Sequence, residues 1–308
     1  MKSRISLKIT IIVLTVIIIA IPSFLLFCPP QEEQIVEEKQ APQLAINSIH
    51  NEKGIQLSWN SIEQANEYLI YRKRLGEERK ELQCKTKKTI ITDETIKSGD
   101  RVRYTVVARD DNKVICSGSI NDAFYRVCIE TAHGIDENDK WDPGCSWNGT
   151  DEAKLMLPIT RSMVKYLEAN GIVVYTDAFT ENESNLFAML DYLDTHDVSA
   201  FVNVHCDYEY ADSGTLSLYN TEEQKKLGQC LSKGVHQVID ISDRGMEFRD
   251  DLETLCNKKV HCPSCLFETG SIKDDFTILS EQYDDYGKGL AKGLCDYLGV
   301  KFNDKIIE

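Results

Sequence analysis

Residues 200–205 read Ala-Phe-Val-Asn-Val-His, and residues 126–131 read Arg-Val-Cys-Ile-Glu-Thr. Both runs are short and largely apolar, as buried strands are. Between them, residues 153–170 carry apolar side chains every three or four positions, which predicts an amphipathic helix. Strands that alternate with helices build layered α/β domains. We therefore predict a twisted, mostly parallel sheet flanked by helices over residues 126–302.

The rest of this region continues the alternation. We expect further strands at residues 172–175 and 214–219 and a further helix at residues 184–195. Thr221, with Gln224 three positions later, predicts a capping box at the start of another helix. Ser280 is predicted to cap the last helix, and Pro158 to kink the first helix or shift its start. The pattern as a whole is that of an α/β domain.

Two histidines follow directly from predicted strands: His133 after residues 126–131, and His205 at the end of residues 200–205. In open α/β sheets, functional groups gather at the carboxyl ends of the strands. A catalytic zinc needs three protein ligands and an open position, and Glu152 at the start of the first helix is a suitable third ligand. Glu268, after another apolar run, is a candidate for proton transfer. A buried histidine is often only a core residue, so this metal site is one of two interpretations.

The eleven cysteines give no clear pairing. The group formed by Cys256, His261, Cys262 and Cys265 has no second matched pair of ligands, so we expect a disulfide or buried thiols there rather than a metal. Cys206 should point away from His205, because neighbouring residues of a strand face opposite sides of the sheet.

Residues 9–28 are apolar and uncharged, and about twenty helical residues span about 30 Å, the thickness of a bilayer core. Basic residues precede this run and acidic residues follow it, so the rest of the chain is expected outside the cytoplasm. We predict a membrane anchor at residues 1–28 and a linker at residues 29–42. The alternatives are a cleaved signal peptide, which would release a secreted protein, and a lipid on Cys28.

The net charge is −15. A nucleic-acid-binding protein needs a basic surface to meet phosphates, so this class is excluded. Electrostatic docking on an anionic surface is disfavoured for the same reason. The charge is consistent with solubility of the extracytoplasmic part.

Residues 43–125 alternate apolar and polar side chains, with turn signals about every ten residues, which predicts an all-β immunoglobulin-like sandwich. Trp59, Tyr68 and Tyr104 stand in the order and spacing of fibronectin type III domains, which this stretch resembles. It carries no recognisable catalytic group. We interpret it as a spacer or adhesive module.

A series of motifs follows one another along residues 126–302: Thr131-Ala132-His133-Gly134, Asp142-Pro143-Gly144, Glu152 leading an apolar helix, Val202-Asn203-Val204-His205, the strand beginning at Gly214, Asp243-Arg244-Gly245, and Leu266-Phe267-Glu268-Thr269-Gly270. In these motifs and their order, this region resembles family 3 N-acetylmuramoyl-L-alanine amidases, the zinc-dependent enzymes that cut peptidoglycan. The chain departs from the family in a longer acidic loop at residues 136–142, in Asp207 where Asn is usual, and in Ser271 where Phe is usual.

The resemblance implies that His133, Glu152 and His205 bind Zn²⁺ and that Glu268 is the catalytic base. It also implies that the enzyme cuts the amide between the muramic acid lactyl group and L-alanine. Peptidoglycan is therefore the expected partner. Two alternatives stay open. One is a zinc peptidase that cuts stem or cross-bridge peptides, and the other is a non-catalytic wall-binding or adhesion protein.

Overall fold

The computed structural model describes residues 43–136, 138, 140–179 and 186–305. No helix within these ranges is long and apolar enough to cross a membrane. The apolar run at residues 9–28 and the linker at residues 29–42 lie outside the described residues. The anchor therefore stays a prediction.

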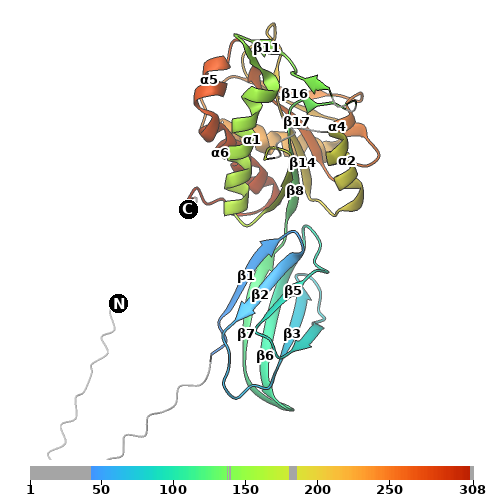
Figure 1. The fold of residues 1–308 in the computed structure, drawn as a ribbon, viewed down its shortest axis with the longest axis vertical. Helices are drawn as coiled ribbons and strands as arrows, with labels where there is room; N and C mark the ends of the chain where they lie inside the picture. The colour runs from blue at the N-terminus through green and yellow to red at the C-terminus, as the bar shows by residue number, and fades with distance from the viewer. Residues whose placement is uncertain (1–42, 137, 139, 180–185, 306–308) are drawn as a thin grey trace, which may run out of the picture. The chain divides into compact units, whose positions relative to one another are not determined.

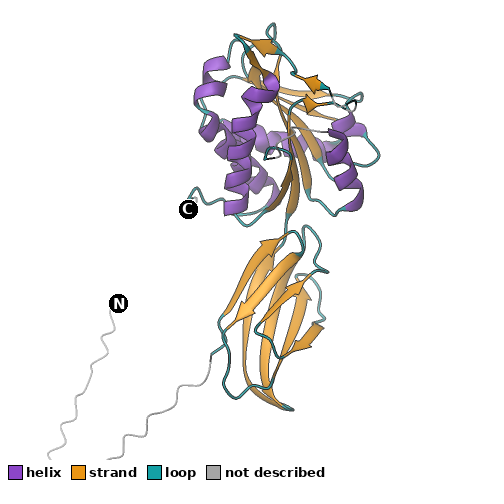
Figure 2. Cartoon of the chain, in the orientation of Figure 1, coloured by secondary structure: helices purple, strands orange, loops and turns teal. Residues whose placement is uncertain are grey.

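Residues 46–123 form two antiparallel sheets that share one apolar core (Figures 1 and 2). Trp59, Tyr68 and Tyr104 are all buried in this core, and the Tyr104 hydroxyl donates a 2.6 Å hydrogen bond to Asp93. The sequence thus predicted the all-β character correctly, while the relation to fibronectin type III domains stays a prediction. One sheet has the order β1 (Ile46–Asn51), β2 (Gly54–Trp59), β5 (Ile90–Asp93), and the other β4 (Glu81–Thr86), β3 (Glu67–Arg74), β6 (Arg101–Asp110), β7 (Lys113–Ala123).

The α/β region is built on one six-stranded sheet. All neighbouring strands run parallel except β15 and β17, so the mostly parallel sheet is confirmed as a mixed sheet with one antiparallel pair. The order is β13 (Val173–Thr176), β8 (Arg126–Thr131), β14 (Ala200–Asp207), β17 (Ser264–Ser271), β15 (Thr215–Tyr219), β16 (Asp243–Phe248). Two small hairpins lie between β8 and the first helix: β9 (Gly134–Ile135) with β10 (Trp141–Asp142), and β11 (Ser146–Trp147) with β12 (Thr150–Asp151).

Helices cover both faces of this sheet (Figure 2). On one face, the largest apolar core joins the sheet to α1 (Glu152–Ala169), α3 (Glu222–Val235), α5 (Phe276–Glu281) and α6 (Tyr283–Leu298). On the other face, smaller apolar clusters hold α2 (Leu186–Thr195) and α4 (Glu253–Cys256). The site described below lies on this second, less covered face, because Asn203 and His205 alternate with the core residues Val202 and Val204 along β14.

Three local predictions have clear outcomes. The capping box of Thr221 and Gln224 is present at the start of α3. The cap at Ser280 was wrong, because Ser280 lies inside α5, where its hydroxyl donates to the Phe276 carbonyl, and α6 begins at Tyr283. Pro158 lies inside α1, which begins at Glu152, so the predicted shift of the helix start was wrong and the predicted kink stays a prediction.

Asp275, which is 2% exposed, ties the start of β15 to the end of β17. Its Oδ2 atom accepts hydrogen bonds from the backbone N–H groups of Gly214 (2.9 Å) and Ser271 (2.8 Å). Its Oδ1 atom accepts a 2.6 Å hydrogen bond from the Ser213 hydroxyl. The carboxyl end of β17, which carries Glu268, is thus fixed by a buried carboxylate.

We predict that Asp275→Ala lowers the free energy of unfolding by about 2–4 kcal/mol, because two buried N–H groups lose their acceptor. Chemical denaturation measures this change. The neighbouring Asp274 is exposed, so Asp274→Ala is the matched control and should change stability by about 0.5 kcal/mol or less. Equal effects of the two substitutions would contradict the role of Asp275.

Candidate active site

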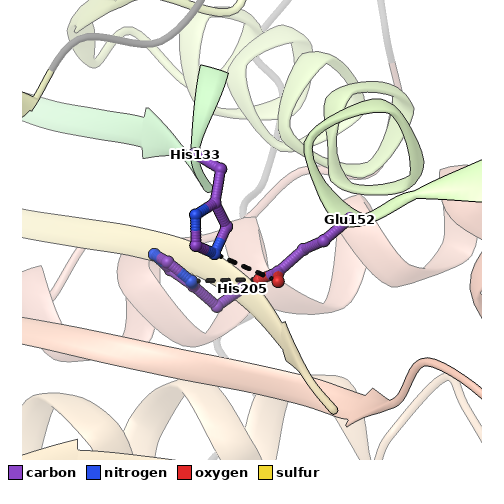
Figure 3. Close-up of side chains that lie close together, drawn as sticks. All are labelled: His133, Glu152 and His205. Atoms are coloured by element: carbon purple, nitrogen blue, oxygen red, sulfur yellow. Dashed lines mark hydrogen bonds and ion pairs between the residues drawn. The ribbon is translucent and has the colours of Figure 1, made fainter. Parts of the chain in front are cut away.

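The structure brings His133, Glu152 and His205 together at the carboxyl ends of β8 and β14 (Figure 3). His133 Nε2 lies 3.1 Å from Glu152 Oε2, and His205 Nδ1 lies 3.1 Å from Glu152 Oε1. The three potential ligand atoms all lie within 4.8 Å of one another. Two imidazole nitrogens and one carboxylate oxygen are a frequent ligand set of catalytic zinc.

The local backbone explains why these side chains converge. His133 has φ = 58°, a left-handed conformation that turns its ring out of the line of β8 toward α1. Gly144 lies against the pair, and a Cβ atom there would come within 2.6 Å of Glu152 Oε2 and 2.7 Å of His133 Nε2. Only glycine leaves this space open, which accounts for the Asp142-Pro143-Gly144 motif.

Asp142 orients His133. Its Oδ2 atom lies 2.9 Å from His133 Nδ1, so Nδ1 carries the proton of that hydrogen bond and Nε2 faces Glu152. A carboxylate on the far nitrogen of a histidine ligand fixes the ring and its tautomer in many metal sites. The residues present therefore fit a zinc ion.

Glu152 is the buried centre of the group, with 3% of its surface exposed. Burial alone would raise the pKa of its carboxyl, but the hydrogen bonds and charges of His133 and His205 outweigh burial and hold that pKa well below its usual range. Burial alone would lower the pKa of His133. The hydrogen bonds and charges of Glu152 and Asp142 outweigh burial and raise that pKa to about 9. Without metal, the site thus holds an ionised carboxylate and a protonated imidazole, and a metal cation would replace that proton.

Cys145 is a further contact of Glu152 that the sequence analysis did not single out. Its backbone N–H and its thiol both approach Glu152 Oε2, at 3.2 Å and 3.3 Å, and the backbone N–H of Cys206 donates to Oε1 at 3.1 Å. Cys206 is buried in the core on the opposite face from His205, as predicted. The position of Cys145 directly after the Asp142-Pro143-Gly144 motif was the available signal.

Other cysteines do not form a site among the described residues. Cys256, Cys262 and Cys265 are free thiols, and only Cys265 is fully buried. The expected alternatives to a metal were a disulfide or buried thiols, and the structure favours thiols. Cys84 and Cys116 lie on opposite edge strands of the four-stranded sheet and are also unpaired.

Glu268 stands opposite His205 on the neighbouring strand β17, where the two residues are paired in register. Its Oε2 atom is shielded from solvent and has no hydrogen-bond partner among the described residues. Burial, with repulsion from Glu152 and Asp207, raises the pKa of Glu268 to about 8, although Arg244 and His133 oppose the rise. A carboxylate with a pKa near neutrality and no partner is suited to exchange protons.

Arg244 and Asp207 form an ion pair beside this carboxylate. Arg244 Nη1 lies 2.8 Å from Asp207 Oδ2, and Arg244 Nε donates a 2.8 Å hydrogen bond to the Gly214 carbonyl. Asp207, one of the departures from the family pattern, thus has a defined partner. The pair holds the loop after β14 to the start of β15 and β16.

Two histidines at strand ends and a buried glutamate at a helix start, with a second glutamate beside them, are the groups of a hydrolase. The family model described as N-acetylmuramoyl-L-alanine amidase matches residues 127–296, which is more than half of the chain. The chain therefore belongs to the N-acetylmuramoyl-L-alanine amidase family, and it is a hydrolase that acts on peptidoglycan. A comparison with curated proteins gives no match.

The solved structures that this chain matches include several amidases. AmiC2 of Nostoc punctiforme is 25% identical over 57% of this chain and 97% of its own, with a TM-score of 0.49. An amidase from Clostridium difficile 630 is 22% identical over 58% and 98%, and the catalytic domain of CwlV from Bacillus (Paenibacillus) polymyxa var. colistinus is 18% identical over 58% and 100%, both with TM-scores of 0.49. The family assignment rests on the family match.

We predict that zinc binding at pH 7 releases about one proton from His133, whose pKa of about 9 keeps it protonated in the metal-free protein. Zinc affinity should accordingly rise about tenfold per pH unit on the acidic side of pH 9 and level off above it. Calorimetric titrations in buffers of different ionisation enthalpy measure this proton release. His236→Ala, outside the site, should leave the proton release unchanged, whereas a wild-type protein that binds zinc without releasing a proton would contradict the pairing of His133 with Glu152.

Proposed function

We propose that His133, Glu152 and His205 hold Zn²⁺ and that Glu268 is the catalytic base of the amidase reaction. The observation that carries the proposal is the convergence of three ligand atoms within 4.8 Å beside the space left by Gly144. When bound, Zn²⁺ supplies a Lewis acid for the amide carbonyl and lowers the pKa of water. The bond cut is the amide between the muramic acid lactyl group and L-alanine.

The residues of the chain have distinct tasks. Asp142 keeps the Nε2 atom of His133 free of its proton when the imidazole is neutral. The Oε2 atom of Glu268 has no hydrogen-bond partner in the described ranges, so it can take a proton from the attacking water and pass it to the leaving amine nitrogen of L-alanine. Arg244 is held by Asp207 and opposes the rise in the pKa of Glu268, which keeps part of its carboxyl ionised at neutral pH.

Glu268→Gln should bind zinc as the wild type does and should lower kcat by about 10²–10⁴-fold, because the amide side chain cannot accept the proton. His205→Ala should lose zinc and activity together. Zinc content by atomic absorption and turnover of a soluble muropeptide measure the two effects. Glu247, an exposed residue of β16, supplies the matched control Glu247→Gln, which should behave as the wild type. Wild-type turnover by Glu268→Gln would show that another group is the base.

We further propose that residues 1–28 anchor the enzyme in the cytoplasmic membrane and that residues 43–125 are a fibronectin type III-like spacer. The anchor is supported by the uncharged run at residues 9–28 with basic residues before it and acidic residues after it. The spacer is supported by the two antiparallel sheets and their buried Trp59, Tyr68 and Tyr104. The catalytic residues would then face the wall from outside the cytoplasm.

The full chain should sediment with membranes and resist extraction by alkaline carbonate, and a chain that begins at residue 41 should stay in the supernatant. Immunoblots of cell fractions measure this distribution. A shortened form in the culture medium would instead support the cleaved signal peptide.

A further inference from the structure

A cavity of about 480 Å³ opens beside His133 and His205 and extends along the face of the sheet away from Glu268. Its floor is one row of side chains, Glu130, Asn203 and Leu266, which are paired in register across β8, β14 and β17. Asn203 and Leu266 lie two residues before His205 and Glu268 on the same strands. Since residues two apart face the same side of a strand, this row lies directly next to the catalytic row.

The cavity is strongly acidic. Among the described residues that line it are five carboxylates and no lysine or arginine: Glu130, Asp136, Asp142, Asp251 and Glu253. Asp142 pairs with His133, and Asp251 pairs with Arg249. A bound Zn²⁺ would offset only two negative charges, so the cavity keeps an excess of negative charge with metal in place.

Within the part of the chain that the structure describes, two buried polar atoms of the cavity lack a hydrogen-bond partner. Asn203 is 1% exposed; its amide nitrogen donates to the Glu130 carboxylate, and its Oδ1 atom has no partner. Thr254 is 5% exposed, and its hydroxyl oxygen has no partner either. Buried polar atoms are nearly always hydrogen-bonded, so these two indicate a ligand that completes them. An amide oxygen accepts hydrogen bonds, and therefore the ligand must donate them.

We propose that this cavity binds a primary ammonium group of the substrate next to the scissile amide. The proposal rests on the amidase function and names the form of peptidoglycan that the enzyme prefers. An ammonium group donates three hydrogen bonds, and its positive charge is attracted by the carboxylates of the cavity. In peptidoglycan the group has two sources, the side-chain amine of a diamino acid in the stem peptide and the amine of an amino sugar that lacks its acetyl group.

The apolar walls of the cavity are suited to an aliphatic chain that ends in an ammonium group. Leu186, Phe187, Leu252 and Leu266 line the cavity with apolar surface between the acidic groups. A side chain such as that of lysine places its methylene groups on apolar surface and its charge among acceptors. A substrate carboxylate in this cavity would be repelled, so stem peptides with amidated carboxyl groups should also be cleaved faster.

The test compares kcat/KM for N-acetylmuramoyl peptides that end in lysine, in Nε-acetyl-lysine or in glutamate. We expect the lysine substrate to be favoured about fivefold or more over the acetylated one, and the glutamate substrate to be the poorest. A second pair of substrates carries glucosamine with a free or an acetylated amine. A preference within the first set places the ammonium on the peptide, and a preference only within the second pair places it on the sugar.

Glu253→Gln and Thr254→Val should each reduce the preference for the free amine several-fold without abolishing cleavage of the acetylated substrate. Their matched controls are Glu223→Gln in α3 and Thr277→Val in α5, both exposed and outside the cavity, and these should keep the wild-type preference. Equal cleavage of free and acetylated amines in both sets would overturn the proposal, as would a preference that Glu253→Gln and Thr254→Val leave intact.

Binding of the same ligands to Glu268→Gln, measured by calorimetry, reports on the cavity without turnover. If no substrate is cleaved by the wild type but the free-amine ligands still bind more tightly, the amidase function fails while the cavity assignment stands. If cleavage occurs and binding does not depend on the amine, the cavity assignment alone fails.

Discussion

The site depends on one buried negative charge, the carboxylate of Glu152. A carboxylate with 3% exposure is costly to bury unless it is fully hydrogen-bonded and paired. Glu152 meets both conditions, since His133 and His205 approach its two oxygens and the backbone N–H groups of Cys145 and Cys206 donate to them. The same contacts bring two imidazoles to one point from two different strands, so the element that stabilises the fold locally also assembles the ligand set.

The strand order and register of the sheet bring Glu268 next to this group. Parallel β8 and β14 end side by side, and β17 pairs with β14 in a register that sets Glu268 opposite His205. Burial in this place, together with repulsion from Glu152 and Asp207, raises the pKa of Glu268. One row of the sheet, with His205 and Glu268, holds the proposed catalytic groups, and the row before it, with Asn203 and Leu266, forms the floor of the adjacent cavity.

The sequence predicted much of this because strand ends and helix starts leave strong patterns. The four residues His133, Glu152, His205 and Glu268 each follow or precede an apolar run, and the structure brings them to one end of the sheet. Contacts made by isolated residues of irregular segments leave no such pattern. The contact of Cys145 between two hairpins, that of Thr254 in a four-residue helix, and the break at Gln282 between α5 and α6 therefore became visible only in the structure.

The central claim is that this site cuts the amide between the lactyl group and L-alanine. Mass spectrometry of purified peptidoglycan after digestion tests it most directly. We expect released peptides that begin with a free L-alanine and glycan strands whose muramic acids carry a free lactyl carboxylate. New amino termini inside the stem peptide or the cross-bridge would contradict it and indicate a peptidase, and intact peptidoglycan would indicate a wall-binding protein without activity.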